Sequence, residues 1–130
     1  MRDYRITIRS TVDGETNEII TFGSVNKEYG STYVSYFDDE TQSPTRIVIG
    51  IDNVSIIREG EISSVLTFEE GKTTDSAIRT AYGDIPLTLQ TVGVGSMEWE
   101  GGVGVNLDYV TDFGGETSRF AISVKAEKIN

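Results

Sequence analysis

Residues 53–91 read NVSIIREGEISSVLTFEEGKTTDSAIRTAYGDIPLTLQT, and this stretch decides the fold. Short runs with many β-branched residues are separated by Glu59-Gly60, Glu70-Gly71 and Tyr82-Gly83. Glycine at each break supplies the backbone freedom that a tight reversal needs. The stretch therefore predicts consecutive strands joined by short turns, each lying beside the strand before it.

The chain on both sides continues this alternation of apolar and polar residues, which is typical of half-buried strands. Further strands are predicted over residues 4–12, 17–26, 32–38 and 45–52 before the stretch, and over 94–100, 103–109 and 120–126 after it. A bulge is expected near Gly23. The apolar stripes, which include Ile47, Leu66 and Val105, are expected to face a common interior.

About ten strands of this kind in one open sheet would leave exposed edges, which invite aggregation. Closing the sheet removes the edges, so the regular meander of hairpins favours a single antiparallel up-and-down β-barrel over residues 1–130. A sandwich of two sheets is the alternative, because a single apolar stripe on each strand fits both folds. We find no convincing helical periodicity, so the predicted fold class is all-β.

The composition bounds the location of the protein and its partners. A chain of 130 residues suits one domain with one core. The formal net charge of −10 opposes binding to nucleic acid and to anionic membrane surfaces. The amino-terminal sequence MRDYRITIRS has no apolar run of signal-peptide length, and no stretch reaches the ~20 apolar residues of a membrane span. We therefore expect a soluble, cytoplasmic protein.

The chain contains no histidine and no cysteine. This excludes Ser-His and Cys-His triads, histidine acid–base catalysis and the usual zinc sites. Carboxylates gather at Asp38-Asp39-Glu40, Glu69-Glu70 and Glu98/Glu100, where turns and a polar strand face indicate solvated surface charge. The first of these groups also lacks the spacing of a calcium loop. We expect no enzyme activity, no cofactor and no metal site.

One charged residue and several aromatic residues are candidates for the lining of the barrel. Alternation places Arg58 on an apolar strand face, where a guanidinium needs a partner. It is a structural plug at one barrel end, a residue at the rim beside Gly60, or an anchor for a ligand carboxylate or phosphate. Trp99 is expected to share an apolar face with Met97. The full set of candidate lining residues is Arg58, Tyr36, Phe68, Tyr82, Trp99 and Tyr109.

A series of short motifs runs in order along the chain. They are Gly30-x-x-Tyr33-x-x-Tyr36, Ile57-Arg58-x-Gly60, Phe68-x-x-Gly71 and Thr80-x-Tyr82-Gly83, followed by Thr91. Over residues 4–126 the series resembles the YwiB-like family of bacterial proteins of unknown function. The resemblance implies a single calycin-like, lipocalin-type β-barrel. It implies no established activity, so the matching positions carry no assigned roles.

Two interpretations of the function remain open. The first is non-enzymatic binding of a small, mostly apolar ligand inside the barrel, which rests on the resemblance in fold and on the inward candidates. The second is a packed structural or interaction barrel that acts through its acidic surface or by self-association as a homodimer. An enzyme based on carboxylates or arginine is the least favoured. The volume and lining of the interior, and the neighbours of Arg58, distinguish the first two.

Overall fold

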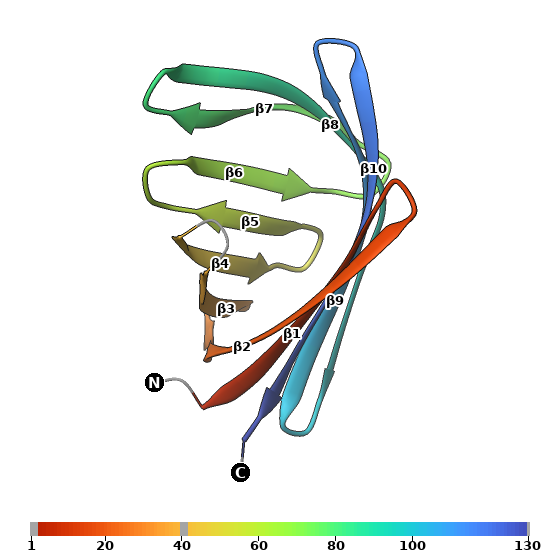
Figure 1. The fold of residues 1–130 in the computed structure, drawn as a ribbon. Coiled ribbons are helices and arrows are strands. Elements are labelled where there is room, and N and C mark those ends of the chain that lie inside the picture. The colour runs from red at the N-terminus through yellow and green to blue at the C-terminus, as the bar shows by residue number, and fades with distance from the viewer. Residues whose placement is uncertain (1–2, 40–41, 130) are drawn as a thin grey trace.

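The computed structural model describes residues 3–39 and 42–129, and these fold into antiparallel strands that close into a barrel (Figure 1). The strands are β1 (Tyr4–Val12), β2 (Glu15–Glu28), β3 (Ser31–Asp38), β4 (Ser43–Ile49), β5 (Val54–Arg58), β6 (Ser63–Phe68), β7 (Thr73–Thr80), β8 (Gly83–Trp99), β9 (Gly102–Phe113) and β10 (Glu116–Lys128). Each strand pairs with its neighbour in sequence, and β1 pairs with β10. The predicted all-β, up-and-down, calycin-like barrel is confirmed, and the two-sheet alternative is wrong.

Closure is made by the first and last strands, which pair along the whole of β1. The ladder runs from Tyr4 opposite Lys128 to Val12 opposite Phe120. The start of β1 and the end of β10 lie at the same end of the barrel (Figure 1). We call this the closed end, and we call the other end, where the β1–β2, β5–β6 and β9–β10 turns lie, the open end. No helix among the described residues is long and apolar enough to cross a membrane.

A bulge in β8 decides which side chains of its second half face inward. The β8–β9 register shifts between Thr91 and Gly93, so that Val92 is the extra residue. Since side chains alternate along a strand, one extra residue moves every later side chain to the opposite face. Thr91 lies inside opposite Tyr109, but after the bulge it is Glu98 that shares the inner face, opposite Val103. The expectation that Met97 and Trp99 face the interior is therefore wrong.

Trp99 instead covers the outer face of β9. A Cβ atom placed on Gly102 would lie 2.5 Å from the Trp99 indole, and one on Gly104 would lie 3.3 Å from it. These two glycines therefore make the flat surface on which the indole ring packs. The outward position of Trp99 thus depends both on the bulge and on the missing side chains opposite it.

Gly23 marks the corner where β2 changes partners. Gly23 pairs with Tyr4 of β1 on one side and with Tyr36 of β3 on the other. A Cβ atom at Gly23 would clash with the carbonyl oxygen of Ser35 and the side chain of Ile6. No register shift is found in the β1–β2 or β2–β3 ladders, so the predicted bulge is wrong, and the glycine instead permits a close approach of two strands.

Most of the core occupies the closed half of the barrel, and Leu87, opposite Ser76, extends it along β8. Its buried side chains include Ile6, Val34, Ile47, Ile49, Val54, Ile56, Phe68, Leu89, Val103, Val105, Leu107, Val124 and Ala126. At the closed end, Lys27 Nζ donates to Glu98 Oε2 at 3.0 Å, and Thr32 Oγ1 donates to Glu98 Oε1 at 3.2 Å. This polar group bridges β2, β3 and β8 below the apolar core. That end of the barrel is filled by packed side chains and closed by an ion pair.

Candidate functional site

The inward-facing side chains are not equally buried along the barrel, and this difference defines the site. In the closed half they are almost fully buried, as Ile47 and Phe68 show. Toward the open end, many residues on the same inner face are only partly buried, although Ser43, Thr45, Leu87 and Thr111 are buried there. The partly buried residues, which we call the open half, are Ile8, Ser10, Ile19, Arg58, Ser64, Leu66, Ser76, Ile78, Ser118 and Phe120. Side chains that point inward and still contact solvent indicate that this half is not filled.

An aromatic layer separates the two halves. The rings of Phe68 and Tyr109 lie 4.7 Å apart between centroids at 55° to each other, and Tyr109 stacks on Phe120 at 5.0 Å with the planes nearly parallel. Both distances are typical of favourable aromatic contacts. Phe68 and Tyr109 are buried, whereas Phe120 is partly exposed. The layer therefore forms the inner floor of the open half.

Arg58 projects from the end of β5 into the open half, beside this floor. The ladder places it opposite Thr45 of β4 and Ser64 of β6, on the inner face. Its Nε atom is buried and has no hydrogen-bond partner among the described residues. None of the ion pairs found in residues 3–39 and 42–129 involves Arg58. The guanidinium is thus partly desolvated without a carboxylate to balance its charge.

Two tyrosine side chains lie close enough to Arg58 for its positive charge to affect their pKa values. Burial raises the pKa of Tyr36 to about 12, although the positive charge of Arg58 opposes the shift and the carboxylate of Asp38 adds to it. Burial likewise raises the pKa of Tyr109 to about 12, again against the attraction of Arg58. Both phenols therefore stay protonated at neutral pH and keep a hydroxyl proton to donate.

Thr111 adds a second unsatisfied polar group to the inner face. It follows Tyr109 by two residues on β9, so both side chains point inward. Thr111 is 5% exposed, and its Oγ1 atom has no partner among the described residues. Buried polar atoms normally find a partner, so an orphan here is unusual. The inner face thus offers the guanidinium of Arg58 and the hydroxyls of Thr111, Tyr36 and Tyr109.

A pocket gives access to Arg58 where the barrel wall is weakest. Within the described residues, β6 and β7 are joined by two residue pairs, Ser63 with Arg79 and Ser64 with Ile78. Beyond them, one side-chain hydrogen bond, from Ser76 Oγ to the Val65 carbonyl at 2.8 Å, bridges the strands. A pocket of about 510 Å³ lies at this seam. Its lining is Ile57, Arg58, Glu59, Ser63, Ser64, Val65, Ser76, Ala77, Arg79 and Asp84.

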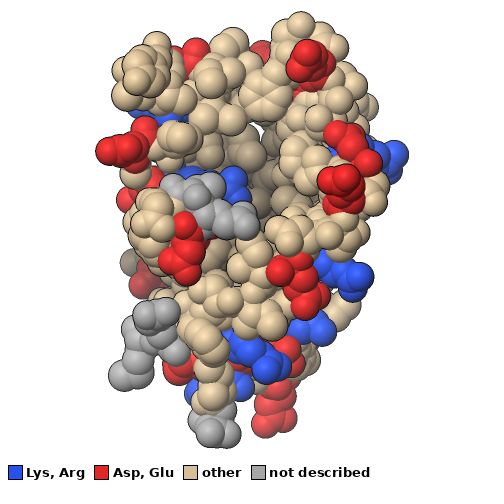
Figure 2. All heavy atoms as spheres, in the orientation of Figure 1, with Lys and Arg blue, Asp and Glu red and all other residues tan. Residues whose placement is uncertain are grey.

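A smaller pocket lies on the other side of Tyr36. It has a volume of about 100 Å³ and opens between β2 and β3, where Ile8, Ile19 and Asp38 contribute to its lining. Figure 2 shows that the molecule is hollowed on this view, between the side formed by β4–β7 and the side formed by β1, β2 and β10. Mostly uncharged residues line the visible part of the hollow, while acidic residues are scattered over the surrounding surface (Figure 2).

The structure brings together four of the six predicted lining residues. Arg58, Tyr36, Phe68 and Tyr109 lie on the inner face, at or next to the aromatic floor. The prediction that Tyr82 lines the interior is wrong, because β7 ends at Thr80 and Tyr82 is fully exposed in the following turn.

The prediction that Trp99 lines the interior is also wrong, because the bulge at Val92 turns its side chain to the outer face. Two inner residues were not among the candidates. Phe120 belongs to a clean apolar stripe, so pairing it with Tyr109 could have revealed it. For Thr111 the sequence carries no signal, because its place depends on the register of the barrel.

The acidic groups do not form a metal centre in the part of the chain that the structure describes. No cluster of three or more carboxylates suited to an ion is present there. In the group Asp38-Asp39-Glu40, Glu40 lies outside the described residues. Glu98 is held by Lys27 and Thr32, whose hydrogen bonds lower its pKa. These carboxylates therefore act in local ion pairs and turns.

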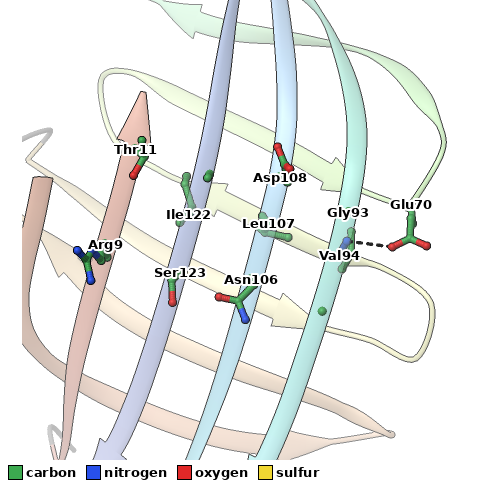
Figure 3. Close-up of a pocket in the computed structure, with 12 residues that line it drawn as sticks. Arg9, Thr11, Glu70, Gly93, Val94, Asn106, Leu107, Asp108, Ile122 and Ser123 are labelled. Carbon is green, nitrogen blue, oxygen red and sulfur yellow. Dashed lines mark hydrogen bonds between the residues drawn. The ribbon is translucent and has the colours of Figure 1, made fainter. Parts of the chain in front are cut away.

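A groove similar in volume to the seam pocket lies outside the barrel (Figure 3). It has a volume of about 500 Å³ and crosses β1, β10, β9 and β8 on the outer wall. Small residues such as Gly93 and Ala121 form its base, and Glu70 Oε1 accepts a hydrogen bond from the Val94 amide at 3.4 Å (Figure 3). Asp108 at its edge pairs with Arg119 at 3.0 Å. Because its carboxylates Glu70 and Asp108 already have partners within the protein, the groove is a weaker candidate than the open half.

Comparison with known proteins identifies relatives in sequence and in fold. Residues 4–123 match the family described as "Domain of unknown function (DUF1934)". The solved structure of the ywiB protein from Bacillus subtilis superimposes with a TM-score of 0.87 at 20% sequence identity, covering 96% of this chain and 90% of that one. At this identity the likeness establishes a shared fold. No curated protein matches the chain.

Proposed function

The chain belongs to the DUF1934 family of domains of unknown function, and from that premise we propose that it binds a small, mostly apolar molecule in the open half of its barrel without transforming it. The observation that carries the proposal is the difference in burial along one continuous inner face. On β6, Phe68 is fully buried in the filled half, whereas Leu66, two residues nearer the open end on the same inner face, is only partly buried. Barrels of this size are either filled by side chains or hold one small ligand.

The lining of the open half suits an apolar molecule. Leu66, Ile78 and Phe120 present aliphatic and aromatic surface that is packed against the core but still reachable. Binding sites for small molecules are typically concave and mostly apolar, with a few polar groups that fix orientation. A binding role without catalysis fits a chain that lacks histidine and cysteine.

The test is to titrate the protein with the neutral dye N-phenyl-1-naphthylamine and to examine gently purified protein by native mass spectrometry. We expect saturable dye fluorescence with about one site per chain and, in a fraction of the protein, a co-purified small molecule. Leu66→Trp should block binding of the dye, whereas Val65→Trp, at an outward position on the same strand, should not. Absence of both saturable fluorescence and bound compound would rule the proposal out.

A second candidate is self-association through the outer face of β2 and β3. Ile20, Phe22 and Phe37 are exposed there, which is unusual for large apolar side chains on a monomer. Light scattering over a range of concentrations distinguishes the two. A dimer that dissociates in Phe37→Lys would favour this candidate, and a monomer at all concentrations would exclude it.

A further inference from the structure

We propose that the ligand carries one anionic group, a carboxylate or a phosphate, which binds the Arg58 guanidinium beside the aromatic floor of the barrel. This inference rests on the proposed function, because it assigns the chemistry of a ligand in the same open half. It goes further in naming the anchoring residue and the charge that this residue selects.

The first support is the unbalanced charge of Arg58. Its Nε atom is buried without a partner, and no ion pair found in the described residues reaches its guanidinium. A desolvated cation without a counter-charge is costly for the folded protein. An anion that pairs with it removes this cost and forms charge-assisted hydrogen bonds, which a planar guanidinium makes especially well with carboxylate and phosphate.

The second support is the set of neutral donors around the guanidinium. The Tyr36 and Tyr109 hydroxyls stay protonated because burial holds their pKa at about 12. A protonated phenol donates a hydrogen bond to an anion, whereas a phenolate would repel it. Thr111 Oγ1 is a further unpaired hydroxyl on the same inner face. Arg58 shares a hydrogen bond with the Tyr36 hydroxyl, but Arg58 Nε and Thr111 Oγ1 have no partner among the described residues, so the inner end of the open half keeps donors that an anion can use.

The negative charges nearby do not cancel this arrangement. Asp38 acts on Tyr36 from the rim, and Glu59 and Asp84 line the seam pocket at its outer part with Arg79. The net charge of the chain is −10. This field disfavours anions in general, so a preference for an anionic ligand has to arise locally, at Arg58. The acidic rim also disfavours a ligand with several anionic groups, so we expect the ligand to carry one.

The seam between β6 and β7 gives the route. The pocket of about 510 Å³ includes Arg58, Ser64 and Ser76 from the inner face together with Val65 and Ala77 from the outer face. A molecule that enters there reaches Arg58, and its apolar part then extends past the pocket to Leu66 and Ile78, the inner-face neighbours of Ser64 and Ser76 along β6 and β7. The ligand that fits is amphipathic, with a single anionic head and an aliphatic or aromatic body.

The experiment compares two dyes that differ by one sulfonate group. N-phenyl-1-naphthylamine is neutral, and 1-anilinonaphthalene-8-sulfonate carries a sulfonate on the same ring system. Arg58→Met is the test variant. Arg46→Met is the matched control, because Arg46 is exposed on the outer face of the neighbouring strand, opposite Ile57. Dodecanoate, dodecyl phosphate and dodecanol then compete with the neutral dye on the unchanged protein, which separates a carboxylate from a phosphate preference.

We expect Arg58→Met to lower the affinity for the anionic dye about tenfold or more and to change the affinity for the neutral dye by no more than about twofold. Arg46→Met should change the affinity for either dye by no more than about twofold. Dodecanoate or dodecyl phosphate should compete about tenfold better than dodecanol. The competition uses no variant, so it decides the matter even if Arg58→Met does not fold. Equal competition by dodecanol would overturn the anionic head group and leave the proposed function standing. Failure of the neutral dye to bind, together with the absence of any co-purified compound, would instead remove the proposed function itself.

Discussion

Tyr36 and Tyr109 lie where the filled and open halves of the barrel meet. Their hydroxyls face the charge of Arg58, and their rings belong to the buried core. At neutral pH these phenols stabilise the folded chain through burial and donate hydrogen bonds only where an acceptor is present. Their ionisation is therefore a direct report on the inner end of the site.

Stability should fall as the pH rises from about 10 to about 12. The folded pKa of each buried tyrosine is about 12, above the ordinary value of 10.0, so the unfolded chain loses these protons first. Each tyrosine should contribute a loss of roughly 2 to 3 kcal/mol over this range. Urea unfolding at several pH values should show a shallower decline in Tyr36→Phe and Tyr109→Phe. The exposed Tyr82→Phe is the control, and equal declines in all variants would contradict the burial of these phenols.

Truncating an isoleucine should cost much more in the filled half than in the open half. Ile56→Ala leaves a void in packed surroundings and should lower the free energy of unfolding by about 2 to 5 kcal/mol. Ile78→Ala removes the same atoms from a partly exposed position, so we expect a loss below about 1.5 kcal/mol. Both residues point inward on short strands. Equal losses, measured by urea unfolding, would mean that the barrel is packed throughout.

At the level of strands, the register of β8 explains what could not be predicted from the sequence. Alternation alone assigns Met97 and Trp99 to the inner face, because a glycine within a strand does not by itself locate a bulge: Gly93 adjoins one, whereas Gly23 does not. Likewise, Tyr82 is exposed because β7 ends at Thr80 and Tyr82 lies in the turn that follows, and alternation does not predict where the strand ends. By contrast, Ile47 and Val105 were placed correctly, since they lie within strands that run without interruption.

The outer packing of Trp99 can be tested with its own fluorescence, because it is the sole tryptophan of the chain. Gly102→Ala introduces a methyl group 2.5 Å from the indole and should push the ring into solvent, shifting its emission to longer wavelength. Gly95→Ala on β8 is the matched control, as nothing lies within 4 Å of the added carbon. An unchanged spectrum in Gly102→Ala would mean that the indole does not rest on β9.

The weak seam between β6 and β7 should be visible by hydrogen exchange. Amides of β6 beyond Ser64 that point toward β7 lack a strand partner on that side. We expect them to exchange about tenfold or more faster than amides of β4, which is paired on both sides. Native-state exchange followed by NMR measures both sets in one sample. Equal protection would show that the seam is closed and that entry to Arg58 takes another route.

For the molecule as a whole, the strand order follows from the sequence pattern, whereas the site depends on how the barrel closes. Alternating stripes and glycine turns predict antiparallel neighbours, and the cost of open edges favours a barrel. How far side chains fill that barrel depends on its tilt and on which residues meet across it, as Phe68, Tyr109 and Phe120 do. Those partners come from distant parts of the chain. The half-filled interior is thus a property of the closed structure.

The most direct measurement is a methyl NMR titration of the whole protein with N-phenyl-1-naphthylamine. If the open half holds the ligand, the methyl signals of Ile8, Leu66 and Ile78 shift with saturation, while those of Ile47 and Val54 stay in place. Shifts confined to outer residues such as Val65, or the absence of any saturable shift, would contradict a barrel that is packed at one end and receives a small molecule at the other.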